Sequence, residues 1–589
     1  MTGSQAHSGA DAASSYRPGP AGSEATAWWW WLVLLAFAIL VLAPGIDSMP
    51  VTDRDEGRFA QATTQMLETG DYVDIRFQDT PRHNKPIGIY WLQSATVGLF
   101  SAVEDRAIWG HRLPSLIGAI ASVMLTAAIG ATLAGRRVGL LAGALMASSI
   151  VLNAEARIAK TDAMLLACIL ATIWPLVRAY IQARDRHDGA PGERPWGWAG
   201  LFWGAMGAAI LIKGPIVLIP VVGIALGLSA WQRRWRWLLD LRPWPGVLLT
   251  GAVALPWLVA ITLVSDGAFW TDSLGEDMFG KVLSGQNTHG APPGYHTGLF
   301  VGVFWPGSIL FLLAIPWIIQ SWRDDRVRLL LAWIAAVWVV FEIASTKLPH
   351  YTLPGLPAFA ILTALALVNG TGWLQGATAV SRWTRWIMIS LWALGTAALA
   401  LVMPIGALML EGGFEPFTLS ASIALLGFGW WTILLLRRDK AQQAALTIVG
   451  GAGLFLAATF STTLGSFQTV WISPRLAEAM DRAAPCDDPR FGSAGYHEPS
   501  FIFLTATETQ VGDDGRVLSA LNGADCAVIA ITEERLDGMQ ASAHANGTPL
   551  PPPLDQPVQG FNLNGGDPLT IWLHVFDRTV PAPAPPSPR

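Results

Sequence analysis

Two acidic residues stand where polar loops meet long apolar runs. Asp55 lies in the charged segment 53–58, shortly after the first apolar run, and Asp162 opens a later one. Charges this close to hydrocarbon cost free energy unless water solvates them or a function uses them. An acid in such a place can deprotonate an acceptor hydroxyl or stabilise positive charge at an anomeric carbon. The two acids therefore indicate a group-transfer site at a membrane surface.

Basic residues stand at the same kind of border. Lysine and arginine at headgroup depth can hold phosphate oxygens and stabilise the charge that develops as a phosphate leaves. Snorkelling of the side chain to lipid headgroups explains some of them equally well, Arg157 and Lys160 above all. The set favours a site for a lipid-borne phosphate. Its members are Arg58, Lys85, Arg157, Lys160, Lys213 and Lys347.

Simpler explanations exist for several of these residues. Asp55 could belong to a solvated acidic turn, and Asp162 could cap the helix that it opens. His350 and Tyr351 could anchor the chain at the membrane interface. The functional interpretation therefore rests on the whole set and not on any one residue.

The elements that position these residues are apolar helices. With 52% hydrophobic and 14% charged residues and a mean hydropathy of +0.41, the chain has too little polar surface for several soluble domains. We expect a polytopic α-helical membrane protein whose 29 tryptophans lie largely at the lipid interfaces. Thirteen apolar runs predict thirteen transmembrane helices. They begin near Trp28, Leu113, Val138, Asp162, Trp198, Pro215, Gly246, Thr297, Leu329, Tyr351, Arg385, Phe417 and Ala445.

The apolar segment 86–100 is shorter than the roughly 20 residues that a transmembrane helix requires. If it lies in the interface instead of crossing, all short basic loops fall on one side, which predicts a cytoplasmic N-terminus. The cations near the two acids then lie on the outer side, against the usual charge bias. An anionic ligand would explain them.

The chain divides into a membrane part and a small outer domain. This α/β domain has strand-like runs at 501–504, 527–531 and 569–576, and Cys486 and Cys526 could form a disulfide there. No phosphate loop, dinucleotide motif or nucleic-acid motif is present. The expected parts are a disordered tail at 1–26, a transmembrane domain at 27–465 with outer loops at 46–112 and 266–297, the outer α/β domain at 466–578 and a disordered tail at 579–589.

One short helix is predicted in the first outer loop. Residues 57–68 place Phe59, Ala62, Met66 and Leu67 on one face, and Gly70 can end the helix. Asp55 would then lie just before this helix, at the membrane surface.

The motifs match those of a known family both in their order along the chain and in the side of the membrane on which they lie. The matching segments are Asp55–Ala60, Met66–Asp71, Lys85–Pro86 with Tyr90–Leu92, Ala156–Arg157 with Thr161–Asp162, Lys213–Pro215, Lys347–Tyr351 and Gly495–Ser500. Over about residues 28–576 the chain resembles the bacterial lipid A aminoarabinose transferases. These are inner-membrane GT-C glycosyltransferases related to protein O-mannosyltransferases.

The resemblance implies a function and a set of roles. The enzyme would move a sugar from a polyprenyl-phosphate donor to lipid A or another envelope glycolipid, on the periplasmic face. Asp55 would be the central catalytic acid and Asp162 the second. The carrier phosphate would be held by Arg58, Lys85 and Lys213, and the substrate cavity would be lined by Glu56, Tyr295, Lys347, His350 and Tyr351.

This sequence departs from its relatives beside Lys85. Asn84 replaces a glutamate that is common there, and an amide is a poorer ligand for a divalent metal than a carboxylate. Gly88 replaces part of a proline-rich pattern. The resemblance allows a divalent metal as cofactor, and Asn84 argues against it. The donor sugar could be a uronic acid, mannose or arabinose, passed to core, polymer or protein.

Two other classes of protein remain open. A transporter or flippase for a lipid-linked sugar would be expected to carry charges at mid-membrane and internal repeats, and neither is evident. A structural assembly protein would leave the acidic and basic motifs without a task. The pattern favours the enzyme.

Overall fold

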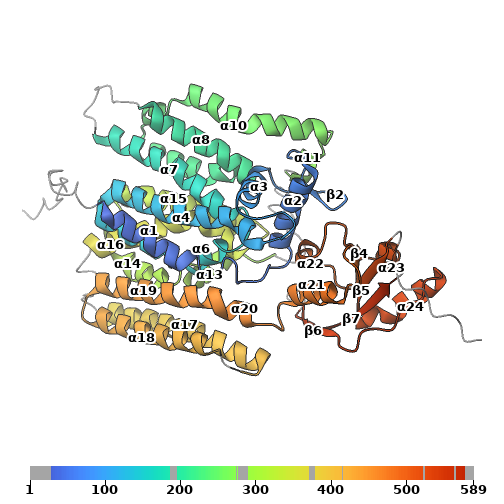
Figure 1. The fold of residues 1–589 in the computed structure, drawn as a ribbon. Helices are drawn as coiled ribbons and strands as arrows, with labels where there is room; N and C mark the ends of the chain where they lie inside the picture. Colours follow the sequence, from blue (N-terminus) through green and yellow to red (C-terminus); the bar gives the residue numbers. More distant parts are fainter. Residues whose placement is uncertain are drawn as a thin grey trace, which may run out of the picture.

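The chain folds into a helical bundle with a small α/β domain at one end (Figure 1). The structure is a computed structural model that describes residues 28–185, 195–273, 275, 290–369, 379–413, 415–521, 524–562 and 566–577. Much of the outer loop expected at 266–297 lies outside these residues. The segment from α2 (Asp55–Thr69) to α3 (Gly88–Phe100) lies between the long helices and the α/β domain, so a site there touches both.

The bundle consists mainly of long apolar helices. In the described part, eight helices are long and apolar enough to cross a membrane, or nine if the bent pair α13 (Tyr295–Val303) and α14 (Gly307–Gln320) is one crossing. The others are α4 (Ile108–Ala134), α7 (Asp162–Asp185), α8 (Trp196–Lys213) with α9 (Leu218–Gln232), α10 (Pro243–Val264), the 3₁₀ helix η4 (Pro349–Gly355) with α16 (Leu356–Asn369), α17 (Ala379–Glu411), α18 (Pro416–Arg437) and α19 (Ala441–Ala458).

The thirteen expected crossings stay a prediction, because length alone does not decide some of them. α1 (Trp29–Leu42) has 14 residues and α5 (Arg136–Ala147) has 12, fewer than an upright crossing requires. α15 (Asp325–Ile343) is longer but carries charged residues.

α8 and α9 form one continuous apolar stretch, but they run in opposite directions. Near the end of α7, Arg178 stacks on Trp198 at the start of α8, and Tyr180 accepts a hydrogen bond from Gln232 at the end of α9. The start of α8 and the end of α9 therefore both lie beside the same end of α7.

Small residues let the central helices approach closely. A Cβ atom added to Gly118 of α4 would lie 2.6 Å from Cα of Met164 in α7, and one added to Gly139 of α5 would lie 2.3 Å from the carbonyl oxygen of Ala127. Glycine at such contacts allows backbones to pack directly. This packing fixes the first turn of α7, where Asp162 lies.

The first outer loop is clamped to α4 by a buried ion pair. α2 (Asp55–Thr69) presents Glu56, whose oxygens accept from Arg112 at 2.7 and 2.9 Å, and both residues are fully buried. Arg112 also donates to the carbonyl oxygens of Ile46, Met49 and Pro50. All the polar groups of a buried pair need such partners, so the clamp holds the N-terminus of α2 in place.

The rest of this loop agrees with the sequence pattern. α2 buries Phe59, Ala62 and Met66 on one face, and Gly70 ends it in the left-handed conformation with φ of 71°. The helix begins two residues earlier than expected, so that Asp55 is its first residue. A hairpin of β1 (Arg76–Phe77) and β2 (Thr80–Pro81) connects it to the 13-residue α3 (Gly88–Phe100).

The C-terminal domain is built on a five-stranded mixed sheet with the order β4-β3-β5-β7-β6. The central β5 pairs in parallel with β3 and antiparallel with β7, and Cys486 and Cys526 form the expected disulfide. The strands are β3 (Arg490–Ala494), β4 (Gln510–Gly512), β5 (Cys526–Thr532), β6 (Val558–Phe561) and β7 (Pro568–Asp577). The helices are α21 (Ile472–Ala483), α22 (Pro499–Leu504), α23 (Asp514–Leu518) and α24 (Leu536–Ala545).

One predicted strand of this domain is wrong. Residues 501–504 belong to α22, not to the sheet. Pro499 suits the first turn of a helix, and Phe501, Ile502 and Phe503 are all buried because α22 packs between α2 and α21. A short apolar run buried on several sides has the same composition in a helix as in a strand.

Candidate active site

Asp162 is the centre of a buried charge cluster. Its Oδ1 accepts from Nζ of Lys213 at 2.7 Å, and Nε2 of His350 lies 3.9 Å from the same oxygen. Nζ of Lys160 lies 3.9 Å from Oδ2. The ends of α7, α8 and η4 meet here, which brings together residues that are 188 positions apart in the chain.

Glu155 adds a second acid to this cluster. Its Oε1 accepts from Nζ of Lys160 at 2.9 Å and lies 3.8 Å from Nδ1 of His350, whereas Oε2 is buried with no hydrogen-bond partner among the described residues. Burial raises the pKa of this carboxyl to about 7, although Lys160 opposes the shift. The sequence interpretation missed Glu155, because nothing in the local pattern distinguishes it from a surface acid.

A cavity of about 480 Å³ opens beside the cluster. Asn84, Lys85, Asp162, Lys213 and Tyr351 line its polar side. Its other walls are apolar and include Ile216, Ile219, Val340, Phe341 and Ile343. Ile343 is 73% exposed at the perimeter of the bundle. The cavity therefore offers cations at one side and a hydrocarbon surface at the other.

Tyr351 and Lys213 lie close together within this cavity. Nζ of Lys213 lies 5.9 Å from the centre of the Tyr351 ring, and this ring packs against His350 and Phe341. An ammonium group at this distance is attracted by the aromatic face. Asp162 and Tyr351 thus hold Lys213 from two directions.

Asp55 is exposed at the start of α2, within electrostatic reach of this cluster. Burial alone would lower the pKa of Lys160, but Glu155, Asp162 and Asp55 together raise this pKa above its ordinary value. Burial and the charge of Arg82 lower the pKa of Arg58, and the charge of Asp55 opposes this shift. Asp55 therefore interacts with Lys160 on one side and Arg58 on the other.

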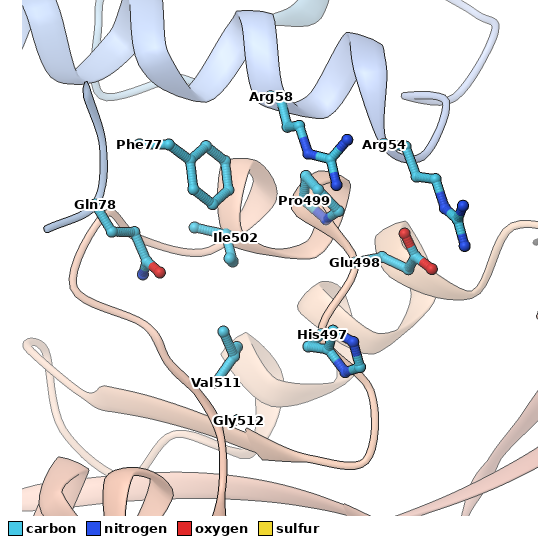
Figure 2. Close-up of a pocket in the computed structure, with 10 residues that line it drawn as sticks. All are labelled: Arg54, Arg58, Phe77, Gln78, His497, Glu498, Pro499, Ile502, Val511 and Gly512. Atoms are coloured by element: carbon cyan, nitrogen blue, oxygen red, sulfur yellow. The ribbon is translucent and has the colours of Figure 1, made fainter. Parts of the chain in front are cut away.

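A second cavity, of about 400 Å³, lies between α2 and the C-terminal domain. Figure 2 shows Arg54 and Arg58 projecting from the α2 side toward Glu498 and His497, which precede α22. The same cavity is bordered by Gln78 of the hairpin loop. Because the cavity presents both positive and negative side chains, a polar ligand can bind here, next to Asp55.

The structure does not bring all the expected site residues into one cavity. Lys85 and Lys213 line the first cavity and Arg58 lines the second. Glu56 is buried in its pair with Arg112. Burial raises the pKa of Glu56, but Arg112 and two backbone N–H groups together hold this pKa below its ordinary value. Asp55 and Glu56 are therefore neighbours in the chain with different surroundings.

Two further expected cavity residues lie outside the lining. Nζ of Lys347 is buried and donates to the carbonyl oxygen of Ala344 at 2.5 Å. Tyr295 opens α13 and packs against His296. Lys347 thus stabilises the turn that carries Thr346 and Ala344, both of which line the first cavity.

The seam between the first loop and the C-terminal domain is polar. Asp53 accepts a hydrogen bond from Ser500, and the hydroxyl oxygen of Ser473 lies 2.7 Å from that of Ser500 and 3.5 Å from Oδ1 of Asp53. Burial raises the pKa of Asp53 to about 6, against the lowering effect of Ser500. Tyr496 contacts Ser473 at 2.6 Å and completes the network.

The described residues do not fit a divalent metal. No group of three or more His, Cys, Asp or Glu side chains within this part of the chain could hold an ion. Asn84, whose amide is a poorer ligand for a divalent metal than a carboxylate, lines the first cavity. No step of the chemistry is therefore assigned to a metal. His289 lies outside the described residues.

Comparisons with known proteins point to one kind of enzyme. Residues 84–259 match the sequence model of the family described as dolichyl-phosphate-mannose-protein mannosyltransferase. The chain is 28% identical over 403 residues to the undecaprenyl phosphate-alpha-4-amino-4-deoxy-L-arabinose arabinosyl transferase of Pseudomonas aeruginosa (strain UCBPP-PA14), covering 68% of this chain and 69% of that one. It is 27% identical over 347 residues to the transferase of the same name from Enterobacter sp. (strain 638), covering 56% and 58%.

Solved structures share the fold. ArnT from Cupriavidus metallidurans bound to undecaprenyl phosphate superposes with a TM-score of 0.69 at 18% identity, covering 93% of this chain and 98% of that one. Its apo form gives 0.67 at 16% identity, covering 94% and 99%. The fold and these similarities define the chain as a multi-pass membrane glycosyltransferase of the GT-C class. Within that class it is similar in sequence to the two arabinosyl transferases and in fold to ArnT.

Proposed function

We propose that this enzyme transfers a sugar from a polyprenyl-phosphate carrier to lipid A or another envelope glycolipid. The observation that carries the proposal is the cavity whose polar side holds Lys85 and Lys213 and whose other walls are hydrocarbon. A polyprenyl phosphate has the same two parts, an anionic head and an apolar chain. The relative with the same fold that was solved with undecaprenyl phosphate supports this choice.

In the proposed reaction, Lys85 and Lys213 bind the carrier phosphate. The bond between the anomeric carbon and the phosphate oxygen breaks, and its electron pair stays on the phosphate. The two ammonium groups stabilise the negative charge that develops on the phosphate in the transition state. They stabilise it more strongly than they stabilise the phosphate of the intact, bound donor. Asp162 holds Lys213 at 2.7 Å in the position that this requires. Asp162 thus acts through Lys213 as a positioning residue.

Asp55 faces the acceptor in this mechanism. The acceptor oxygen forms the new bond to the anomeric carbon, and if it is a hydroxyl, Asp55 takes its proton. If the acceptor is an ionised phosphate, no proton needs to move, and Asp55 stabilises positive charge at the anomeric carbon. The exposed position of Asp55 between the two cavities suits an acceptor that enters from the C-terminal domain.

We further propose that the reaction takes place on the periplasmic face, with the N-terminus in the cytoplasm. Short basic loops favour the cytoplasmic side. The disulfide between Cys486 and Cys526 is suited to an oxidising compartment, which the C-terminal domain would occupy. Since α2 packs on α22 of that domain, the site would share its compartment.

The donor sugar is proposed to be aminoarabinose-like, with another sugar as the alternative. Asn84 lines the cavity beside Lys85 and is the residue that favours the alternative. Gly88 has a packing explanation instead, because a Cβ atom there would lie 2.7 Å from the carbonyl oxygen of Leu211. Close approach of α3 to α8 therefore requires glycine at this position.

Mass spectrometry of envelope lipids tests the proposal. Cells lacking the enzyme are complemented with the wild-type chain or with Asp55→Asn, at matched membrane abundance. We expect a mass increment on lipid A with the wild type alone. An increment on core or polymer would support the alternative acceptor, and identical lipids in all strains would contradict the proposal.

A further inference from the structure

A third cavity lies at the other end of the bundle. It has a volume of about 580 Å³ and is formed by α1, α5, α19 and the end of α16. Val33, Phe37, Leu140 and Leu446 are among its apolar walls. Val33 and Leu446 are strongly exposed, so the groove opens sideways on the perimeter of the bundle. In Figure 1, α1 and α19 lie in the helical part, and the C-terminal domain is at the far end.

One end of this groove is basic. Arg136 and Arg137 line it from the first turn of α5, and Gln442 lines it from the first turn of α19. Among the described residues that line the groove, none is acidic. The groove thus combines a hydrocarbon wall with two positive charges at its mouth.

Arg136 has an unsatisfied hydrogen-bond donor there. Its Nη1 is buried and has no partner among the described residues. A buried donor of a charged group without an acceptor costs free energy. Arg136 and Arg137 also stand at the N-terminal end of α5, where the helix dipole disfavours cations. An anion bound between them would offset both costs.

We propose that this groove binds an anionic glycerophospholipid, with the phosphodiester against Arg136 and Arg137 and one acyl chain along α1, α5 and α19. Guanidinium groups bind phosphate oxygens in a fork geometry, and basic pockets between transmembrane helices suit anionic headgroups. The apolar wall distinguishes a lipid from free phosphate, because only a lipid fills it. This site is separate from the donor cavity, which is lined by Lys85 and Lys213 at the end that faces the C-terminal domain.

The test uses the full-length enzyme in phosphatidylcholine vesicles with a trace of phosphatidylglycerol that carries a photoreactive diazirine in one acyl chain. We expect labelled peptides from residues 29–42, 136–147 and 441–458. Unlabelled phosphatidylglycerol added to the vesicles should compete, and the same fraction of zwitterionic phosphatidylethanolamine, or inorganic phosphate, should not. Equal competition by phosphatidylethanolamine would overturn the proposal, as would labelling that avoids these three helices.

Arg136→Gln should weaken the labelling of these peptides roughly tenfold, since one charge-assisted contact to phosphate is lost. Arg233→Gln is the matched control, because Arg233 is an exposed arginine that follows α9 and lies outside the groove. A second variant, Leu446→Trp, fills the groove from an exposed position and should reduce labelling without removing a charge. Thermal unfolding of each variant verifies that it is folded, and undiminished labelling in both variants would refute the lipid site.

Discussion

Lys213 and Asp162 form a 2.7 Å ion pair between the last residue of α8 and the first residue of α7. Each charge lies at the helix end that favours it, the anion at an N-terminus and the cation at a C-terminus. The pair would therefore form without a substrate, and it leaves other protons of the ammonium group free for a phosphate.

Asp55→Asn should reduce sugar transfer by roughly 10²–10⁴-fold, because the amide cannot accept a proton and carries no charge. Binding of the polyprenyl-phosphate carrier should stay within a factor of about two, since the lysines that hold it are unchanged. Single-turnover transfer and carrier binding by purified enzyme measure the two effects. Asp47→Asn, at an exposed position of the same outer segment, is the control and should transfer normally. Full activity of Asp55→Asn would remove this residue from the mechanism.

Lys85→Ala should weaken carrier binding by roughly 10–100-fold, because a charge-assisted contact to phosphate is lost. Isothermal calorimetry with polyprenyl phosphate in detergent measures the affinity. Arg76→Ala serves as control, because this residue is half-exposed in the hairpin and pairs with Asp74. If both variants bind equally well, the phosphate does not lie beside Lys85.

Asp162→Asn should affect rate more than binding if this residue acts by positioning Lys213. The amide oxygen can still accept a hydrogen bond from Lys213 but carries no charge, so the ammonium group would be held less firmly, and kcat should fall by roughly tenfold or more with a smaller change in KM. Steady-state kinetics over a range of donor concentrations separates the two parameters. An equal loss of binding and rate in Asp162→Asn and Lys213→Ala would indicate that the acid holds the substrate itself.

Glu56→Gln should destabilise the fold by about 3–5 kcal/mol, because it leaves Arg112 buried without its counter-ion. Chemical denaturation in detergent measures the change. Glu478→Gln breaks the exposed pair with Arg482 and should change stability by less than about 1 kcal/mol. Similar stabilities of the two variants would show that the buried clamp does not hold the loop.

Asp53 predicts a pH dependence at the seam with the C-terminal domain. Its pKa is about 6 in the folded chain and near 3.8 in the unfolded chain, so the folded state binds the proton more tightly. This contribution to stability is fully present below pH 3.8 and is lost as pH rises through 6. The unfolding temperature of Asp53→Asn should therefore fall less between pH 5 and 7 than that of the wild type. Parallel curves would contradict the assignment.

The sequence pattern predicts helices and strands with clear periodicity. The face of α2 formed by Phe59, Ala62 and Met66 follows from helical spacing, and β5 and β7 follow from their β-branched runs. The segment 501–504 was assigned wrongly because burial on several sides removes the periodicity that would separate helix from strand. Local patterns thus fail where tertiary packing decides.

The site residues were predictable only one by one. Asp162 and Lys213 were recognisable from their places at the ends of apolar runs, but nothing local shows that they pair. The contact between Glu155 and His350 joins α6 (Ile150–Glu155) to η4. Arg58 and Lys85 stand in the same loop, yet the course of α2 and the hairpin leads them to different cavities. Such distances depend on the complete fold.

The buried ion pair that clamps Glu56 limits how the neighbouring Asp55 can respond to a substitution. Asp55 shares a peptide unit with an immobilised neighbour, so its carboxylate can be moved only by its own side-chain torsions. Lengthening it by one methylene, as in Asp55→Glu, would push the carboxylate outward, and the backbone could not retreat to compensate. For this reason we expect the activity to differ between Asp and Glu at position 55, although the two side chains carry the same charge and differ only in length.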